Sequence, residues 1–145
     1  MNPKVKSQLA KVAICTANDR RTIERFGAPD VWLNGMCLVF ATALHQTFGY
    51  GRLNVLAAVH GKASPMASHV VLEVHGRCID SLGGGTLKTA IKRHDRWLAK
   101  TFKSPPRTAY VPLDQCASNI KCDEKDVADL SEIMRTVASE RGLFT

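Results

Sequence analysis

The sequence predicts an α+β fold, in which a small antiparallel sheet packs against a helix that carries a cysteine at its N-terminus. Apolar residues recur at helical spacing near both ends of the chain, over 5–26 and 123–141. Between them lie segments with the pattern of strands, at 53–60, 69–74 and 77–82, separated by glycine-containing turns. Because the helices flank a central run of strands, the class is α+β and not an alternating α/β fold.

The helices are predicted from apolar spacing and from the signals at their ends. The helix over 5–26 ends at Phe26-Gly27-Ala28-Pro29-Asp30, a stop followed by a turn. A second helix begins at Asn34 or Gly35, with Asn34 as its cap, and runs to Thr47. A basic helix covers about 86–103, before Ser104-Pro105-Pro106. In it we expect Trp97 on the apolar stripe and His94 in solvent.

The clearest strand signal is a hairpin formed by residues 69–74 and 77–82. A two-residue turn, His75-Gly76, joins the two runs and sets which residues face each other. Closing the hairpin there places His69 and Asp80 on one face as diagonal neighbours, within side-chain reach. The opposite face is the expected core side and carries Val70, Leu72, Val74 and Ile79. The loop over 61–68 precedes His69, Gly83-Gly84-Gly85 ends the second strand, and 110–111 is a short strand.

Composition indicates one folded domain over residues 1–145. The chain has 145 residues, 45% hydrophobic and 23% charged, which excludes disordered, collagen-like and coiled-coil classes. No apolar run approaches the roughly 20 residues of a membrane-spanning helix, so no membrane association is expected. The first 15 residues lack the apolar core of a signal peptide, and five cysteines show no framework spacing. We therefore expect a cytoplasmic protein with reduced thiols.

Three residues form the candidate catalytic group: Cys37, His69 and Asp80. Cys37 stands at the predicted start of an apolar helix, where free N–H groups and the helix dipole favour a thiolate. His69 would act as base and then acid, and Asp80 would orient its ring and stabilise the imidazolium. The same helix start offers N–H donors to an oxyanion, and the side chain of Asn34 is a further candidate donor. His45, eight residues after Cys37, is a candidate for a supporting contact with the site, although a surface or core role is favoured.

This order of residues resembles the papain-like superfamily of cysteine hydrolases. The resemblance rests on NGMCLVFATALHQTFGY and HVVLEVHGRCIDSLGG, about 50 residues in all. The short spacing looks most like transglutaminase-like domains, and the layout is also similar to the catalytic core of arylamine N-acetyltransferases. The resemblance implies a papain-like core and a thiol enzyme that acts on an acyl bond, as a peptidase, a deamidase or an acyl or amine transferase, with no cofactor. The partner would be a protein or peptide substrate or a small acyl substrate. Transglutaminase-like domains often have an aromatic residue soon after the histidine, where this chain has Val70-Val71-Leu72.

A non-enzymatic binding module is the alternative interpretation. The formal net charge is +7, and the basic segment over 88–107 holds seven Lys or Arg residues against one Asp. This excess favours an acidic protein or a nucleic acid as partner. A phage or mobile-element protein that interferes with a host factor fits either interpretation. A zinc site is disfavoured because the cysteines and histidines lack close paired spacing. The candidate binding residues are Lys88, Lys92, Arg93 and Arg96.

Overall fold

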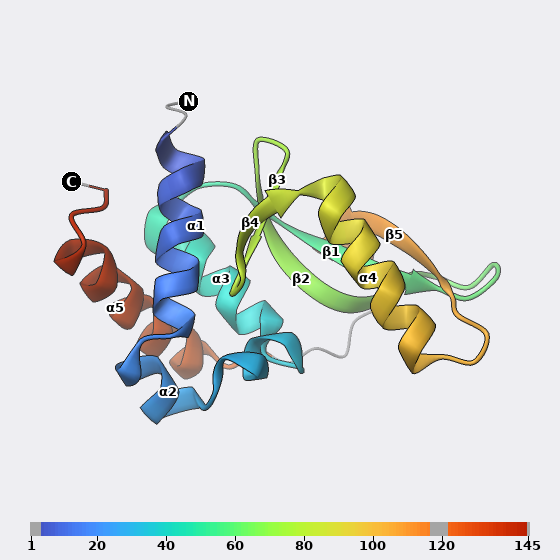
Figure 1. The fold of residues 1–145 in the computed structure, drawn as a ribbon, viewed down its shortest axis with the longest axis horizontal. Coiled ribbons are helices and arrows are strands. Elements are labelled where there is room, and N and C mark those ends of the chain that lie inside the picture. Colours follow the sequence, from blue (N-terminus) through green and yellow to red (C-terminus); the bar gives the residue numbers. More distant parts are fainter. Residues whose placement is uncertain (1–3, 117–121, 145) are drawn as a thin grey trace.

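The structure, a computed structural model, describes residues 4–116 and 122–144. It has the predicted α+β class, with helices around an antiparallel sheet (Figure 1). The helices are α1 (Lys4–Ala17), α2 (Arg20–Phe26), α3 (Cys37–Phe48), α4 (Leu87–Thr101) and α5 (Glu124–Glu140), with short 3-10 segments η1 (Pro29–Leu33) and η2 (Leu113–Gln115). The strands are β1 (Arg52–Val59), β2 (Met66–Val74), β3 (Arg77–Asp80), β4 (Gly83–Thr86) and β5 (Arg107–Pro112).

The five strands form one sheet in the order β4-β3-β2-β1-β5, and every neighbouring pair is antiparallel. The predicted hairpin register is confirmed, because Val74 pairs with Arg77 and Glu73 with Cys78. His75 takes a positive φ of 47° and Gly76 one of 78°, which is typical of a tight two-residue turn. The turn therefore fixes which β2 and β3 side chains share a face.

Helices bury both faces of the sheet. The face with Leu72 and Ile79 packs on α1, α3 and α5 and forms the largest apolar cluster of the fold. The opposite face, with Val71 and Cys78, is covered by α4, which lies apart from α1 and α5 (Figure 1). His69 lies two residues before Val71, and Asp80 lies two residues after Cys78, so both are on the α4 side of the sheet.

β2 contains a bulge directly before His69. Leu56 of β1 pairs with His69 and Ala57 pairs with Ala67, so Ser68 has no partner on β1. An extra residue of this kind bends a strand and changes where the adjacent side chains point. The bulge lies within the expected loop over 61–68, because β2 begins at Met66 and not at His69.

Two predicted elements are wrong in their boundaries. The helix expected over 5–26 is two helices, because the Asp19 side chain accepts the backbone N–H of Arg21 and starts α2 after a break. Residues 83–86 do not end the second strand but form β4, which pairs with β3. A glycine run has no apolar alternation to indicate a strand. At Gly84 an added Cβ would lie 3.0 Å from the Cβ of Ala10, so the missing side chain lets α1 approach β4.

A buried aromatic cluster fixes the segment that leads into α3. Trp32 of η1 is fully buried, as expected for a core anchor, and its ring lies 5.1 Å from the rings of both Phe26 and Phe40. Phe40 belongs to the first turn of α3, so the cluster ties η1 to the end of the helix that carries Cys37.

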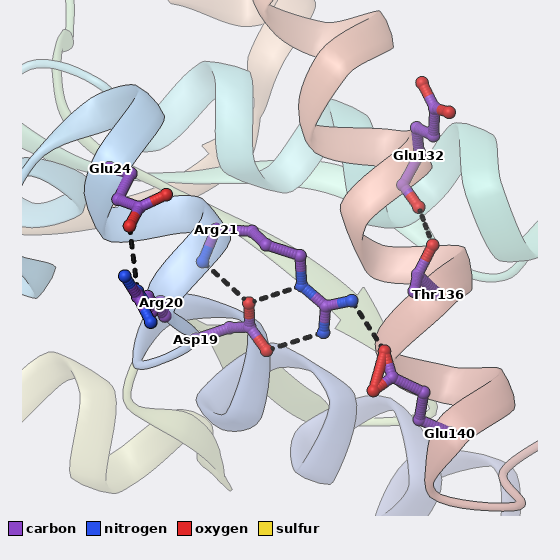
Figure 2. A network of polar contacts seen from close by, with 7 residues as sticks. All are labelled: Asp19, Arg20, Arg21, Glu24, Glu132, Thr136 and Glu140. Atoms are coloured by element: carbon purple, nitrogen blue, oxygen red, sulfur yellow. Dashed lines mark hydrogen bonds and ion pairs between the residues drawn. The ribbon is translucent and has the colours of Figure 1, made fainter.

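Ion pairs on the surface connect α2 to α5 (Figure 2). The Arg21 guanidinium lies 2.8 Å from Asp19 and 2.6 Å from Glu140. Because these groups are exposed, each pair adds less than about 1 kcal/mol, and the apolar contacts carry the packing of α5. No helix among the described residues is long and apolar enough to span a bilayer.

Two glycines with similar backbone angles allow a matched test of this packing. Gly49 and Gly51 have φ of 73° and 75°, but an added Cβ meets nothing within 4 Å at Gly49 and lies 2.5 Å from the Glu73 carbonyl oxygen at Gly51. We expect Gly49→Ala to lower the free energy of unfolding by about 1 kcal/mol, through backbone strain alone. Gly51→Ala should lower it by at least about 2 kcal/mol more, because the β2 backbone must shift. Urea denaturation measures both, and equal effects would contradict the close approach.

Candidate active site

A short hydrogen bond joins the two predicted hairpin residues. His69 Nε2 lies 2.8 Å from Asp80 Oδ2, and the two side chains are 16% and 12% exposed. The second carboxylate oxygen, Oδ1, accepts the backbone N–H of Leu82 at 2.9 Å. Both oxygens of Asp80 are therefore held, and the carboxylate fixes the orientation of the imidazole ring.

Cys37 contacts the same imidazole from the start of α3. It is the first residue of α3, is 3% exposed, and packs among Val55, Ala57 and Val70. Its thiol interacts with the His69 side chain and with the backbone N–H groups of Val70 and Leu38. Because Asp80 holds Nε2, the ring nitrogen left to face Cys37 is Nδ1. The structure thus brings Cys37, His69 and Asp80 together in the order that the sequence predicts.

The electrostatics of these groups favour a charged pair. Burial raises the pKa of the Cys37 thiol, but the hydrogen bond from His69 and the two backbone N–H groups outweigh burial and lower it overall. Burial lowers the pKa of His69, but the hydrogen bonds to Asp80 and Cys37 outweigh burial and raise it to about 9. Both shifts favour a thiolate beside an imidazolium at neutral pH, which is the reactive form of a cysteine nucleophile.

Two other predicted site residues lie outside this group. The prediction that Asn34 caps the helix is wrong, because α3 begins three residues later, with Met36 as N-cap, and the Asn34 side chain donates to the Asp30 carbonyl at 3.0 Å. Its role as an oxyanion donor stays a prediction. His45 lies about 12 Å along the helix axis from Cys37, and its Nδ1 is 2.9 Å from the Tyr50 carbonyl oxygen. That contact ties the end of α3 to the chain before β1.

The predicted basic residues all lie on α4. Their side chains are exposed, and Arg93 reaches toward the site, with Nη1 3.9 Å from Asp80 Oδ2. The exposed face of α4 therefore borders the candidate triad. The residues are Lys88, Lys92, Arg93 and Arg96.

Two residues of α4 exchange their expected places. His94, expected in solvent, is 6% exposed and buried, and Trp97, expected in the core, is 49% exposed. The exchange follows from helix geometry, because His94 lies four residues after Ala90 and four before Leu98, both of which are buried. Sequence reasoning missed both residues, although this spacing of Ala90, His94 and Leu98 was a signal that could have found His94.

The described residues offer no cluster of three or more His, Cys, Asp or Glu side chains arranged to hold a metal ion. Cys78, which faces α4 two positions before Asp80, lies 3.8 Å from the Tyr110 hydroxyl. Burial raises its pKa. Cys78 is therefore an inert reference thiol close to the site.

Comparison with known proteins adds no family assignment. The chain matches no protein-family model, no curated protein and no solved structure.

The charged pair predicts a specific pH titration. We expect the Cys37 thiolate to persist below the ordinary thiol pKa of 9.0, and His69 to keep its proton above its ordinary 6.5, to about 9. The difference in thiolate ultraviolet absorbance between the protein and the Cys37→Ala variant measures the titration of Cys37. NMR of the His69 ring measures the titration of His69. A His69 that titrates near its ordinary value would contradict the pair.

Asp80→Asn tests the cause of the shift. Removal of the carboxylate charge should lower the pKa of His69 and raise that of Cys37, because the imidazolium loses its hydrogen-bonded anion. Glu73→Gln is the matched control, since this carboxylate lies on the same strand face and bonds Arg52 and Tyr110 instead. It should leave the titration of His69 nearly unchanged.

Proposed function

We propose that this protein is a cysteine-dependent enzyme that acts on an amide or other acyl bond. The observation that carries the proposal is the contact chain Cys37–His69–Asp80, in which the Asp80 carboxylate holds one ring nitrogen at 2.8 Å. The opposite shifts of the two pKa values support it, because active sites separate acid and base in this way. A papain-like or transglutaminase-like core is proposed with it, from the order of the residues and the α+β class.

The chemistry follows from the protonation state. The Cys37 thiolate attacks the carbonyl carbon, and the carbonyl π electrons move to oxygen to form a tetrahedral oxyanion. His69 then gives its proton to the leaving amine or alkoxide as the bond to carbon breaks, which leaves an acyl-thioester on Cys37. The neutral imidazole takes a proton from water or from an acceptor amine, whose attack on the thioester carbon releases the thiolate. Asp80 keeps the ring oriented and stabilises the imidazolium in both halves.

The start of α3 suits the oxyanion step. The first N–H groups of a helix have no intrahelical acceptor, and the N–H of Leu38 is already directed at the Cys37 sulfur. The same donors stabilise negative charge that develops next to the sulfur. Whether water or an amine accepts the acyl group depends on the substrate, so peptidase, deamidase and transferase share this first half-reaction.

Trapping the acyl-enzyme tests the proposal. With 4-nitrophenyl acetate, we expect an acetyl adduct on Cys37, located by peptide mass mapping, and turnover with a bell-shaped pH profile whose alkaline limb lies near pH 9, where His69 loses its proton. Cys37→Ser should lower kcat/KM by on the order of 10³-fold or more, and Asp80→Asn by roughly 10²- to 10⁴-fold.

Cys78→Ser is the matched control for this experiment. Cys78 is buried, lies on β3 and directs its thiol at the Tyr110 hydroxyl, so the variant should keep wild-type turnover. Acylation spread over several cysteines, or turnover that survives Cys37→Ser, would refute the enzyme.

A second candidate function, binding of an acidic partner or nucleic acid, is favoured by the exposed basic face of α4. Lys88, Lys92 and Arg96 recur every four residues, so their charges project from one side of the helix. Phosphates bound there would release counterions, which makes binding strongly dependent on salt.

Replacing these three residues with Gln tests the second candidate. The log–log salt slope of duplex-DNA binding should fall by about 2–3, because each lost phosphate contact removes nearly one unit. A control with equal charge replaces Lys11, Lys62 and Arg135, which are exposed on other parts of the surface. If the two triple variants bind alike, α4 is not the binding face.

A further inference from the structure

A pocket of about 240 Å³ lies between α4 and the strands, and His69 and Asp80 of the candidate triad line it. Leu33, four residues before Cys37, forms another part of the wall, so the pocket extends to the segment that leads into α3. Closed apolar cavities of about 150 Å³ hold a benzene ring. This pocket therefore has room for a side chain the size of leucine or phenylalanine, close to the imidazole of His69.

Exposed apolar side chains gather at this pocket. Among the described residues, seven large apolar side chains are exposed, and three of them, Leu33, Leu82 and Trp97, line the pocket. They come from η1, from the turn between β3 and β4, and from α4, so the exposure does not come from a single helix face. Exposed apolar side chains from separate segments that meet at one concave surface are typical of a binding site.

The Trp97 ring in this wall has a fixed support. The ring of the buried His94 stacks on it, with centroids 5.8 Å apart and an interplanar angle of 26°. His94 is itself held by the Thr108 hydroxyl, 2.8 Å from Nδ1. A wall that is ordered before binding loses less conformational entropy when a ligand packs on it.

The charged groups of the wall favour a neutral group inside the pocket. Asp80 and Arg93 both line it, and Arg93 Nη1 lies 3.9 Å from Asp80 Oδ2. The two carboxylate oxygens of Asp80 already bond to His69 and to the backbone N–H of Leu82. A charged ligand group would lose water there without gaining a free partner of opposite charge on Asp80, so an apolar side chain is the better match.

The surface of α4 beside the pocket is positively charged. Arg93, Arg96 and Lys100 are exposed and lie three or four residues from one another or from Trp97, which makes them neighbours on the helix surface. Asp95, the one acidic residue of α4, accepts a hydrogen bond from a hydroxyl of β5. This side of the helix is therefore complementary to negative charge.

We propose that the pocket and the adjoining face of α4 bind a peptide segment in which a large apolar side chain is flanked by acidic residues. The apolar side chain packs against Leu82 and Trp97, and the flanking carboxylates contact Arg96 and Lys100. The inference rests on the proposed function, because it names an acidic peptide or protein as the substrate whose acyl bond Cys37 attacks. The basic face of α4 then belongs to the substrate-binding surface of the enzyme.

Four labelled peptides separate the two parts of the proposal. The first has one Phe between two pairs of Glu residues, the second has Ala in place of Phe, the third has Gln in place of Glu, and the fourth carries both changes. Fluorescence anisotropy measures their binding to the full chain with Cys37→Ala, which cannot be acylated. We expect loss of the Phe ring to weaken binding about tenfold, since an open pocket recovers part of its burial energy. Loss of the charges should weaken binding roughly five- to tenfold, at low salt only.

Two double variants, each made in the Cys37→Ala chain, locate these effects. Leu82→Ala with Trp97→Ala should reduce the preference for Phe over Ala by at least about threefold, because the apolar wall is lost. It should leave the preference for Glu over Gln within about twofold, because the two contacts are independent. Arg96→Gln with Lys100→Gln should have the opposite result.

Matched exposed residues outside the pocket serve as controls, and both control variants should keep the two preferences. They are Ile14→Ala with Ile23→Ala for the apolar wall, and Lys11→Gln with Lys62→Gln for the charges. Four results would overturn the proposal: no measurable binding, equal binding of all four peptides, control variants that act as strongly as the pocket and α4 variants, or tighter binding of an oligothymidine of equal charge.

Two further measurements keep the test decisive. If Leu82→Ala with Trp97→Ala fails to fold, the indole NMR resonance of Trp97 replaces it: the Phe peptide should shift this resonance more than the Ala peptide, and equal shifts would refute the pocket. Acylation of Cys37 by 4-nitrophenyl acetate is measured separately. Peptide binding without acylation refutes the enzyme and leaves the peptide-binding site, whereas acylation without peptide binding refutes this inference alone.

Discussion

The hydrogen bond between His69 and Asp80 is the interaction on which the candidate site depends. It exists because a two-residue turn closes the β2–β3 hairpin and places both side chains on the α4 face. A register slip of one residue would send one of them to the core face among Leu72 and Ile79. The many apolar contacts on that face, each favourable only in the present register, therefore also hold the two polar groups together.

Cys37 reaches the same imidazole through a different set of constraints. Its thiol is buried, and burial alone makes a thiolate unfavourable. The charge is tolerable because His69 and two backbone N–H groups surround the sulfur. These groups come together at the start of α3, which the aromatic contact of Trp32 with Phe40 ties to η1. The bulge at Ser68 changes the path of β2 directly before His69.

The sequence allows the hairpin and its two polar residues to be predicted because everything that determines them is local. Turn length sets the register, and alternation sets the faces. The bulge at Ser68 could not be predicted from the sequence because it depends on the partner strand β1. Strand β4 could not be predicted because its three glycines show no alternation of apolar and polar residues. On α4, residue type gave the wrong burial, although the spacing of the apolar residues indicated the right one. His94 occupies a buried helical position but was predicted in solvent, and the exposed Trp97 was predicted in the core. Both residues line a pocket with His69 and Asp80, where local patterning and tertiary placement disagree.

The two histidines near the pocket have opposite roles because of how each meets its carboxylate. Asp80 bonds His69 directly, and this contact helps to hold a proton on both ring nitrogens. Asp95 acts on His94 through the hydroxyl of Thr108, so the carboxylate accepts the hydrogen bond of the hydroxyl and does not pair directly with the imidazole. With the Thr108 hydroxyl between the aspartate and the histidine, the His94 ring stays neutral and keeps one tautomer. The charge on His69 then reinforces the difference, since it lowers the pKa of His94. A charged imidazole able to deliver a proton and a neutral imidazole of fixed tautomer can therefore lie beside one pocket without competing for the same role.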